Sequence, residues 1–194
     1  MKSGRMRPDL YPELFRVEDN HWWHRHKRLV VHQLISQFAA STGKVIDIGA
    51  GTAKILAELK QTGWQATGVD SEPKAISLAR RRGVKLILAD LAKPLPFDAD
   101  KFDLILCLDV LEHLENDQQM VREIKRVVKS DGLVIISVPA YPWLFSYWDK
   151  MLGHQRRYSK TTLNQLIKAS GLTNRYLGFF GFFWLAPAIL IRYL

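Results

Sequence analysis

Two stretches of the sequence combine residue types that can perform chemistry. In the first, Asp-Ile-Gly-Ala-Gly at residues 47–51, a carboxylate lies close to two glycines. Glycine lets the backbone approach a ligand closely and adopt dihedral angles that a Cβ would penalise. The second is an Asp-x-x-Glu-His run formed by Asp109, Glu112 and His113. On a helical turn these three side chains share one face, where they could move protons or hold a divalent metal ion.

Further carboxylates follow apolar runs. Asp70 stands 19 positions after Gly51, where a carboxylate can accept both hydroxyls of a ribose. Asp90 ends the next run and could meet an adenine amino group or a neighbouring backbone. Asp47 would repel a pyrophosphate from the helix N-terminus that follows, but it suits a ligand carrying an ammonium and a sulfonium. Because Lys54 replaces the third glycine of the dinucleotide fingerprint, nicotinamide binding is disfavoured.

Alternating strands and helices must position these residues. Apolar and β-branched runs predict strands over 44–48, 65–69, 84–88, 102–108 and 133–138. Helical spacing predicts helices over 21–39, 53–60 and 120–128, with others starting at Pro73 and after Ser159. This alternation indicates an α/β fold with a doubly wound, mostly parallel, Rossmann-like sheet covered on both faces. We expect a helical cap or lid over residues 1–40 and one domain over 41–194.

The motifs resemble those of the class I S-adenosylmethionine-dependent methyltransferases. VIDIGAGT (45–52) looks like their first motif, GVDSE (68–72) like their second and LADL (88–91) like their third. FDLILCLDVLEHL (102–114) is similar to the fourth-strand motif of the branch that contains the ubiquinone-pathway O-methyltransferases. The resemblance covers roughly residues 28–138, and the four motifs occur in the family's order and spacing.

This resemblance implies S-adenosyl-L-methionine as the cofactor and S-adenosylhomocysteine as the product. It also implies that the residues contacting the cofactor are Gly49, Gly51, Asp70, Asp90 and Leu108. Asp47 would support the methionine end of the cofactor, and Arg28 would reach the cofactor from the first predicted long helix. The alternative is that the glycines only make the turn between strand and helix.

Candidates for catalysis follow the fourth and fifth predicted strands. Methyl transfer is an in-line displacement, so aligning the reactants can supply most of the acceleration. A base is needed only when the acceptor holds its proton tightly. We expect His154, in the GHQRRYS loop (153–159), to act with Asp109 and His113 in catalysis. The alternative for this loop is a solvated surface segment.

Substrate binding in the same loop is assigned to two arginines. Arg156 and Arg157 could clamp a phosphate or a carboxylate. A divalent metal held by Asp109, Glu112 and His113 is disfavoured, because the first position is Asp and no fourth ligand is evident. We therefore predict no metal ligand, and Glu112 and His113 could instead simply order the turn.

Charge and hydropathy bear on the partners. The net charge is +9, and residues 150–194 carry seven basic groups and no acid. This favours an anionic acceptor, either a small molecule or a lipid-linked one. The apolar segment 178–194 is too short for the roughly 20 residues of a membrane span. It could instead lie at a membrane interface, join the core or contact another subunit.

We expect the C-terminal residues to complete only a portion of the sheet. We expect one strand near residues 174–179 and no partner strand after it, so that the closing hairpin is incomplete and the chain truncated. The lone Cys107 excludes a disulfide framework and a cysteine zinc cluster. We see no secretory signal and expect a cytoplasmic protein, with peripheral membrane contact as an option.

Two other function classes stay open. The pI of about 9.7 would suit a nucleic-acid methyltransferase, but LDVLEH follows the fourth strand in place of an N-P-P-Y-type motif. Nucleic acid is therefore the less favoured partner. A non-catalytic protein that binds the cofactor or a membrane is the other option, since a fold does not define chemistry. The oligomeric state does not follow from the sequence.

Overall fold

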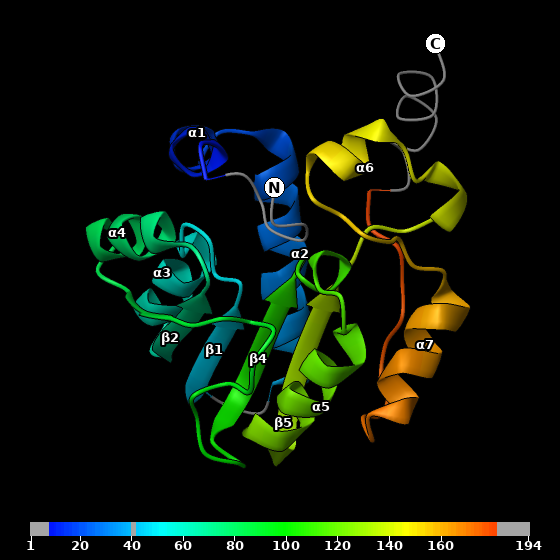
Figure 1. Cartoon of the computed structure of the whole chain (residues 1–194). Helices are drawn as coiled ribbons and strands as arrows, with labels where there is room; N and C mark the ends of the chain where they lie inside the picture. The colour runs from blue at the N-terminus through cyan, green and yellow to red at the C-terminus, as the bar shows by residue number, and fades with distance from the viewer. Residues whose placement is uncertain (1–7, 40–41, 182–194) are drawn as a thin grey trace.

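The molecule is built on a five-stranded sheet in which all neighbouring strands are parallel. The computed structural model describes residues 8–39 and 42–181. The strand order β3-β2-β1-β4-β5 reverses direction between β1 and β4, which is where ligands bind in open α/β sheets (Figure 1). The strands are β1 (Lys44–Ile48), β2 (Gln65–Asp70), β3 (Lys85–Leu88), β4 (Phe102–Leu108) and β5 (Val128–Ser137).

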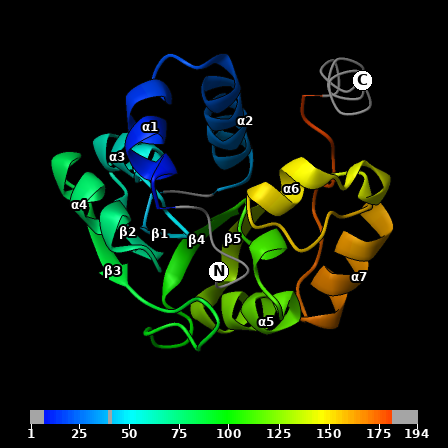
Figure 2. The same cartoon turned by 45° about the horizontal axis from the view of Figure 1, so that its top comes forward.

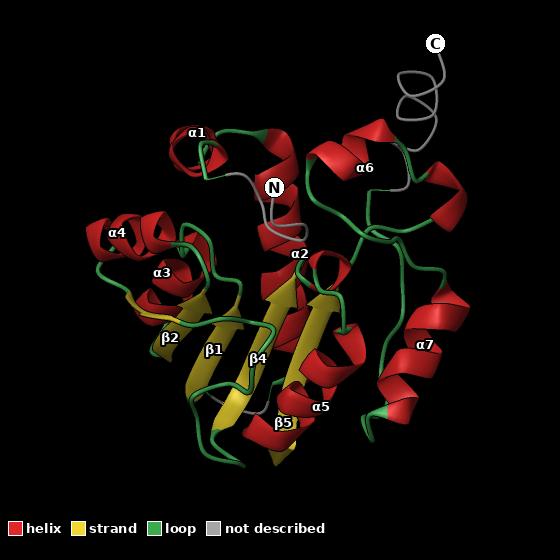
Figure 3. Ribbon diagram, in the orientation of Figure 1, coloured by secondary structure: helices red, strands yellow, loops and turns green. Residues whose placement is uncertain are grey.

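Helices cover both faces of this sheet (Figure 3). One face packs against α2 (Trp22–Phe38), α3 (Lys54–Gln61) and α4 (Pro73–Arg81), and α1 (Leu10–Val17) contacts α4. The other packs against α5 (Asp117–Val127) and α7 (Lys160–Ala169). In β1, Val45 faces the first layer while Ile46 and Ile48 face the second, so both faces are buried.

Short helices form the connections above the carboxyl ends of the strands. They are the 3-10 turns η1 (Leu111–His113) and η2 (Pro142–Leu144) and the helix α6 (Tyr147–Met151). Figure 2 shows α1 and α2 on one side of the strand ends and α6 on the other. α2 also adds Val31 and Ile35 to the core that contains Val45, so its C-terminal half belongs to the sheet layer. A separate lid over residues 1–40 remains a prediction.

The predicted doubly wound architecture is confirmed, and the predicted strands match the observed ones closely. The strand expected near residues 174–179 is wrong: this segment is irregular and pairs with no strand of the described chain. β5 begins at Val128, five residues before the predicted start, and it shifts register after the Phe102–Val128 pair. Within the described residues the sheet is not closed beyond β5. Most of the apolar segment 178–194 lies outside the described residues.

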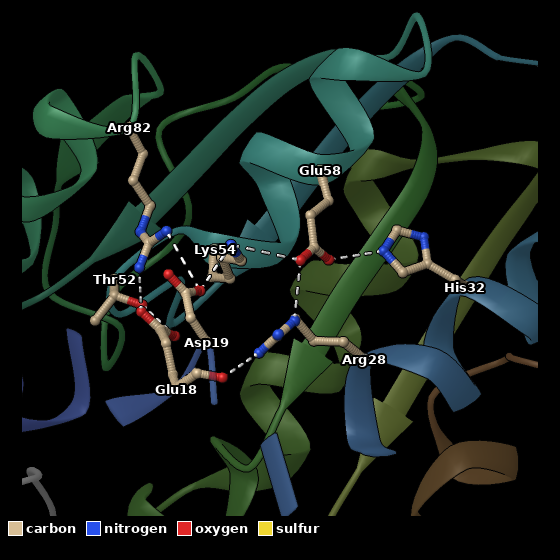
Figure 4. Close-up of polar contacts among 8 residues, drawn as sticks. All are labelled: Glu18, Asp19, Arg28, His32, Thr52, Lys54, Glu58 and Arg82. Atoms are coloured by element: carbon tan, nitrogen blue, oxygen red, sulfur yellow. Dashed lines mark hydrogen bonds and ion pairs between the residues drawn. The ribbon is translucent and has the colours of Figure 1, made fainter. Parts of the chain in front are cut away.

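A network of polar side chains fastens α1 and α2 to the sheet layer (Figure 4). Glu18, at the end of α1, accepts hydrogen bonds from Arg82 Nη2 at 2.7 Å and from Thr52 Oγ1 at 2.7 Å. Arg28 Nη1 donates to the Glu18 carbonyl at 2.8 Å, and its Nε donates to Glu58 of α3 at 3.1 Å. The N-terminal helices are therefore held in place over the first glycine turn.

We predict that Arg82→Met destabilises the fold. Glu18 is only 6% exposed, and burial raises the pKa of its carboxyl even though Thr52 and Arg82 oppose this. Removing one partner of a buried pair leaves the other uncompensated, which costs about 3 kcal/mol. Urea unfolding of Arg82→Met should show this loss, whereas Arg80→Met, on the exposed side of the same helix, should stay within about 0.5 kcal/mol of the parent. Equal losses in the two variants would contradict the assignment.

Candidate nucleoside and acceptor site

A large open cleft extends from the carboxyl ends of the strands along β5 and α7, and most of the predicted site residues line it. Its lining includes Gly49, Gly51, Asp70, Asp90, Leu108, Asp109, His113, His154 and Arg157. Three predicted residues do not line it: Asp47, Arg28 and Arg156. Most of the predicted site residues thus line one cleft, and the roles assigned to them stay predictions.

The glycine turn after β1 is shaped by left-handed backbone. Gly49 has φ +72° and Gly51 has φ +55°, and Ala53 at the start of α3 also has a positive φ of 58°. A Cβ on Gly49 would lie 2.5 Å from Val110 Cγ2, whereas a Cβ on Gly51 would meet nothing within 4 Å. Because Gly49 has no side chain, Val110, the residue before η1, can approach it closely. Gly51 leaves open space on the side of the cleft.

Asp70, the last residue of β2, holds this turn. Its Oδ2 accepts the Gly51 N–H at 2.8 Å, its Oδ1 accepts the Glu72 N–H at 2.9 Å, and the Tyr11 hydroxyl lies 3.4 Å from Oδ1. Burial raises the pKa of this carboxyl, while the two backbone donors oppose the rise. A carboxylate offers about four lone-pair sites, so with these three contacts Asp70 keeps room for about one further donor, such as a ribose hydroxyl.

Asp47 is the last residue but one of β1 and lies beneath the glycine turn, in the buried part of the strand. It is 4% exposed, and its Oδ1 has no hydrogen-bond partner among the described residues. Burial raises the pKa of Asp47 to about 8, against the attraction of Lys27 and with a further rise from Asp70. A ligand ammonium near this carboxyl would supply the missing positive partner, whereas a pyrophosphate would be repelled.

Lys27 is a site residue that the sequence did not single out. Its Nζ donates to Asp109 Oδ2, and Ser137 Oγ donates to Asp109 Oδ1 at 2.8 Å. Burial alone would raise the pKa of Asp109, but Lys27 and Ser137 hold it below the usual value. A cation at helical spacing before the apolar Val31 and Leu34 was the signal in the sequence.

The structure places Arg28 differently from the cofactor role that the resemblance implied. Its guanidinium contacts Glu58 and the Glu18 carbonyl in the network of Figure 4, and Arg28 does not line the cleft. One residue along a helix is a rotation of about 100°, which separates Lys27 inside the cleft from Arg28 outside it. A direct contact between Arg28 and a cofactor stays a prediction.

The GHQRRYS loop brings His154 back to η1. The His154 Nδ1 lies 3.0 Å from Asp149 Oδ1, and Arg157 Nε donates to the same oxygen at 2.7 Å. The His154 ring meets the His113 ring edge-on at a centroid distance of 4.8 Å. His113 Nδ1 in turn lies 3.2 Å from the Gly153 carbonyl. The two histidines predicted to take part in catalysis are therefore neighbours in the cleft.

The two predicted arginine clamps already have partners within the chain. Arg156 donates to the Glu115 carbonyl at 3.0 Å and pairs with Asp117 at 3.1 Å. Arg157 donates to the Ala140 carbonyl at 3.0 Å as well as to Asp149. Both side chains anchor the loop. Their binding to an acceptor stays a prediction.

Glu112 lies below the two histidines, next to Asp109. It is 0% exposed, and neither carboxyl oxygen has a hydrogen-bond partner among the described residues. Burial, reinforced by the charge of Asp109, raises the pKa of Glu112 to about 9. Burial together with the nearby His154 lowers the pKa of His113 to about 4, so His113 is neutral at physiological pH.

We predict that Asp47→Asn stabilises the ligand-free protein at alkaline pH. The unfolded carboxyl ionises near pH 3.8, so between about pH 4 and pH 8 the folded protein holds a proton that the unfolded chain has lost. Stability therefore falls as the pH rises through this window. Asn cannot ionise, so the variant lacks the loss of stability that Asp47 causes. Its free energy of unfolding near pH 8 should exceed that of the parent by about 2–5 kcal/mol.

Urea unfolding at about pH 5 and about pH 8 checks this prediction. The parent should lose stability between the two conditions. Asp47→Asn should lose less, and the loss that remains should come from Glu112, whose pKa is also raised by burial. The matched control is Asp98→Asn, whose side chain is 93% exposed and whose slope should equal that of the parent. An unchanged slope in Asp47→Asn would contradict the prediction.

The fold and the site together define an α/β domain with a glycine turn and acidic residues at the carboxyl ends of three adjacent parallel strands, the edge at which open α/β sheets bind ligands. The sequence model of the methyltransferase domain family matches residues 22–177, and the chain belongs to that family. The class I methyltransferase fold that the motifs implied is thus confirmed.

Individual relatives agree with this family. The chain is 35% identical over 118 residues to the uncharacterised protein MJ1123 of Methanocaldococcus jannaschii, covering 61% of this chain and 54% of that protein. It is 32% identical over 104 residues to the ubiquinone biosynthesis O-methyltransferase of Glaesserella parasuis, covering 48% of this chain and 44% of the relative. The chain therefore spans about half the length of these curated relatives.

The solved structures show the same fold. A chain from the complex between the Haloferax volcanii Trm112 methyltransferase activator and a methyltransferase superposes with a TM-score of 0.71 and 23% identity. The match covers 86% of this chain and 76% of that one.

Proposed function

We propose that this chain binds S-adenosylmethionine in the cleft and transfers its methyl group to a small-molecule or lipid-linked acceptor, one that is anionic. The observation that carries the proposal is the glycine turn held by Asp70, with open space at Gly51 and the buried carboxyl of Asp47 beneath it. Asp47 does not line the cleft, so its charge would attract the cofactor's ammonium through space. Family membership supports the same activity.

The residues around the turn fit the parts of this cofactor. Gly51 leaves space for the backbone to approach the ligand, and Asp70 keeps about one lone-pair site for a ribose hydroxyl. Asp90 and Leu108 line the cleft where an adenine would lie. Lys27 supplies a cation near the methionine end. The cofactor, when bound, supplies an electrophilic methyl group on a sulfonium.

Catalysis then depends on positioning and on proton transfer. Alignment of acceptor and methyl group can supply most of the rate. For an acceptor that must lose a proton, the candidate base is His154, because Asp149 orients its ring through Nδ1. His113 packs against it, and Asp109 keeps a negative charge close by.

Charge supports an anionic acceptor. The described residues from 150 onward contain no acid, and Lys160 and Arg175 line the cleft at the rim formed by α7 and the segment after it. Lys160 also lies over the ring of Phe179 at 4.7 Å. A negatively charged acceptor entering from this side would meet no like charge in this part of the chain.

Exposed apolar side chains next to the cleft support the lipid-linked option. On α6 and just after it, Tyr147, Trp148, Met151 and Leu152 are all exposed. Aromatic side chains beside basic ones suit the headgroup region of a bilayer, which is compatible with peripheral membrane contact of a cytoplasmic protein. Among the described residues, no helix has both the length and the apolar character needed to cross a membrane.

The direct test is isothermal titration with S-adenosylhomocysteine. We expect one molecule bound per chain, and we expect Asp70→Ala to weaken binding at least about 10-fold because hydrogen bonds to a charged group are lost. Asp98→Ala removes the same charge from an exposed loop and should bind as the parent does. A folded parent that gives no heat, or an Asp70→Ala variant that binds equally well, would refute the proposal.

A further inference from the structure

Beside the nucleoside site, three side chains form a cluster of a different kind. Glu112 and His113 come from η1, and His154 comes from the loop before α7. One potential ligand atom from each lies within 4.8 Å of the other two. We propose that Glu112, His113 and His154 bind a divalent transition-metal ion of the zinc type.

The strongest sign is the carboxyl of Glu112. A fully buried polar group without a hydrogen-bond partner is rare and costly, and both oxygens of Glu112 lack a partner in the described part of the chain. Among the other buried acids nearby, Asp149 and Asp70 have two or more donors each, and Asp47 has one unpartnered oxygen, Oδ1. A metal ion within the cluster would satisfy Glu112, whose two oxygens both lack a partner among the described residues.

The imidazoles are held as metal ligands usually are. His154 is bonded through Nδ1 to the buried Asp149, and His113 through Nδ1 to the Gly153 carbonyl. These contacts fix the orientation of each ring and leave its Nε2 available as a ligand atom. A carboxylate or a carbonyl behind the histidine is the usual second layer of a protein metal site.

The donor set selects the kind of ion. Two imidazole nitrogens and one carboxylate suit zinc and its neighbours, whereas magnesium and calcium prefer oxygen ligands. Three protein ligands leave a coordination position open, as in catalytic zinc sites. Asp109 is not a ligand, because Lys27 and Ser137 already hold its two oxygens.

This inference does not rest on the proposed function. It concerns ion binding, which can be measured without cofactor or acceptor. If both hold, the open position lies in the same cleft as the nucleoside site, where an acceptor oxygen could coordinate the ion and lose its proton more readily. His154 would then act as a ligand in place of its role as a base.

The test is a titration of the chelator-treated full chain with Co2+, followed by its visible absorption, and competition by Zn2+. We expect one saturable site per chain. Glu112→Gln and His154→Gln should each weaken it by at least about 10- to 100-fold, the range seen for lesser changes around metal ligands. The only cysteine, Cys107, is buried, so thiols should add little background.

Matched controls separate this cluster from the other histidines and from loss of fold. His21 and His24 have ring centroids 5.2 Å apart and could bind metal by themselves, so His21→Gln with His24→Gln serves as the control. That variant should bind as the parent does. Glu112→Gln keeps the shape of a side chain that is buried without partners, so its near-ultraviolet circular dichroism should match the parent.

The outcomes are decisive in both directions. A single site lost in the two cluster variants and kept in the control supports the proposal. No saturable binding by the folded parent, undiminished binding in folded Glu112→Gln and His154→Gln, or loss only in the His21 and His24 control would overturn it. In the first two cases Glu112, His113 and His154 form only a proton-sharing cluster.

Discussion

The carboxylate of Asp70 is the contact on which the rest of the site depends. It joins three segments: the glycine turn through Gly51, the start of α4 through Glu72, and α1 through Tyr11. The parallel arrangement of β1 and β2 brings the ends of both strands to one edge, so a single side chain can bridge them. Without this bridge the backbone around Gly51 would lose its fixed partner.

The buried acidic side chains fall into two groups, according to whether their carboxyl oxygens have hydrogen-bond partners. Some are fully paired: Glu18 has Arg82 and Thr52, Asp149 has Arg157 and a backbone N–H, and Asp70 has two backbone N–H groups. Asp47 and Glu112, by contrast, are buried with unpartnered oxygens. Such groups cost stability, and natural proteins keep them mainly where a ligand or a proton will use them. This contrast supports the two ligand subsites that we propose, one beside the glycine turn and one at Glu112.

Much of this arrangement followed from local sequence patterns. The strands around Asp47, Asp70 and Leu108 and the turn glycines were predictable, because a buried parallel strand is a short apolar run and the loop after it meets the ligand. These features depend on residues close together in the chain.

What the sequence did not reveal concerns contacts between distant segments. The sequence does not fix the rotation of α2 against the sheet, so it did not show that Lys27 lines the cleft and Arg28 does not; the contact between Arg28 and a cofactor stays a prediction. His154 meets His113 across some forty residues, and no local pattern reveals that pairing. The strand expected at 174–179 lacks a partner strand in the described chain, and an apolar run without a partner does not form a sheet.

The most direct measurement is a crystal structure grown with S-adenosylhomocysteine. The account predicts the ribose hydroxyls on Asp70, the adenine against Leu108 and Asp90, and the amino group of the ligand over Asp47. A nucleoside bound elsewhere in the molecule, or this crevice filled by the protein's own side chains, would contradict it.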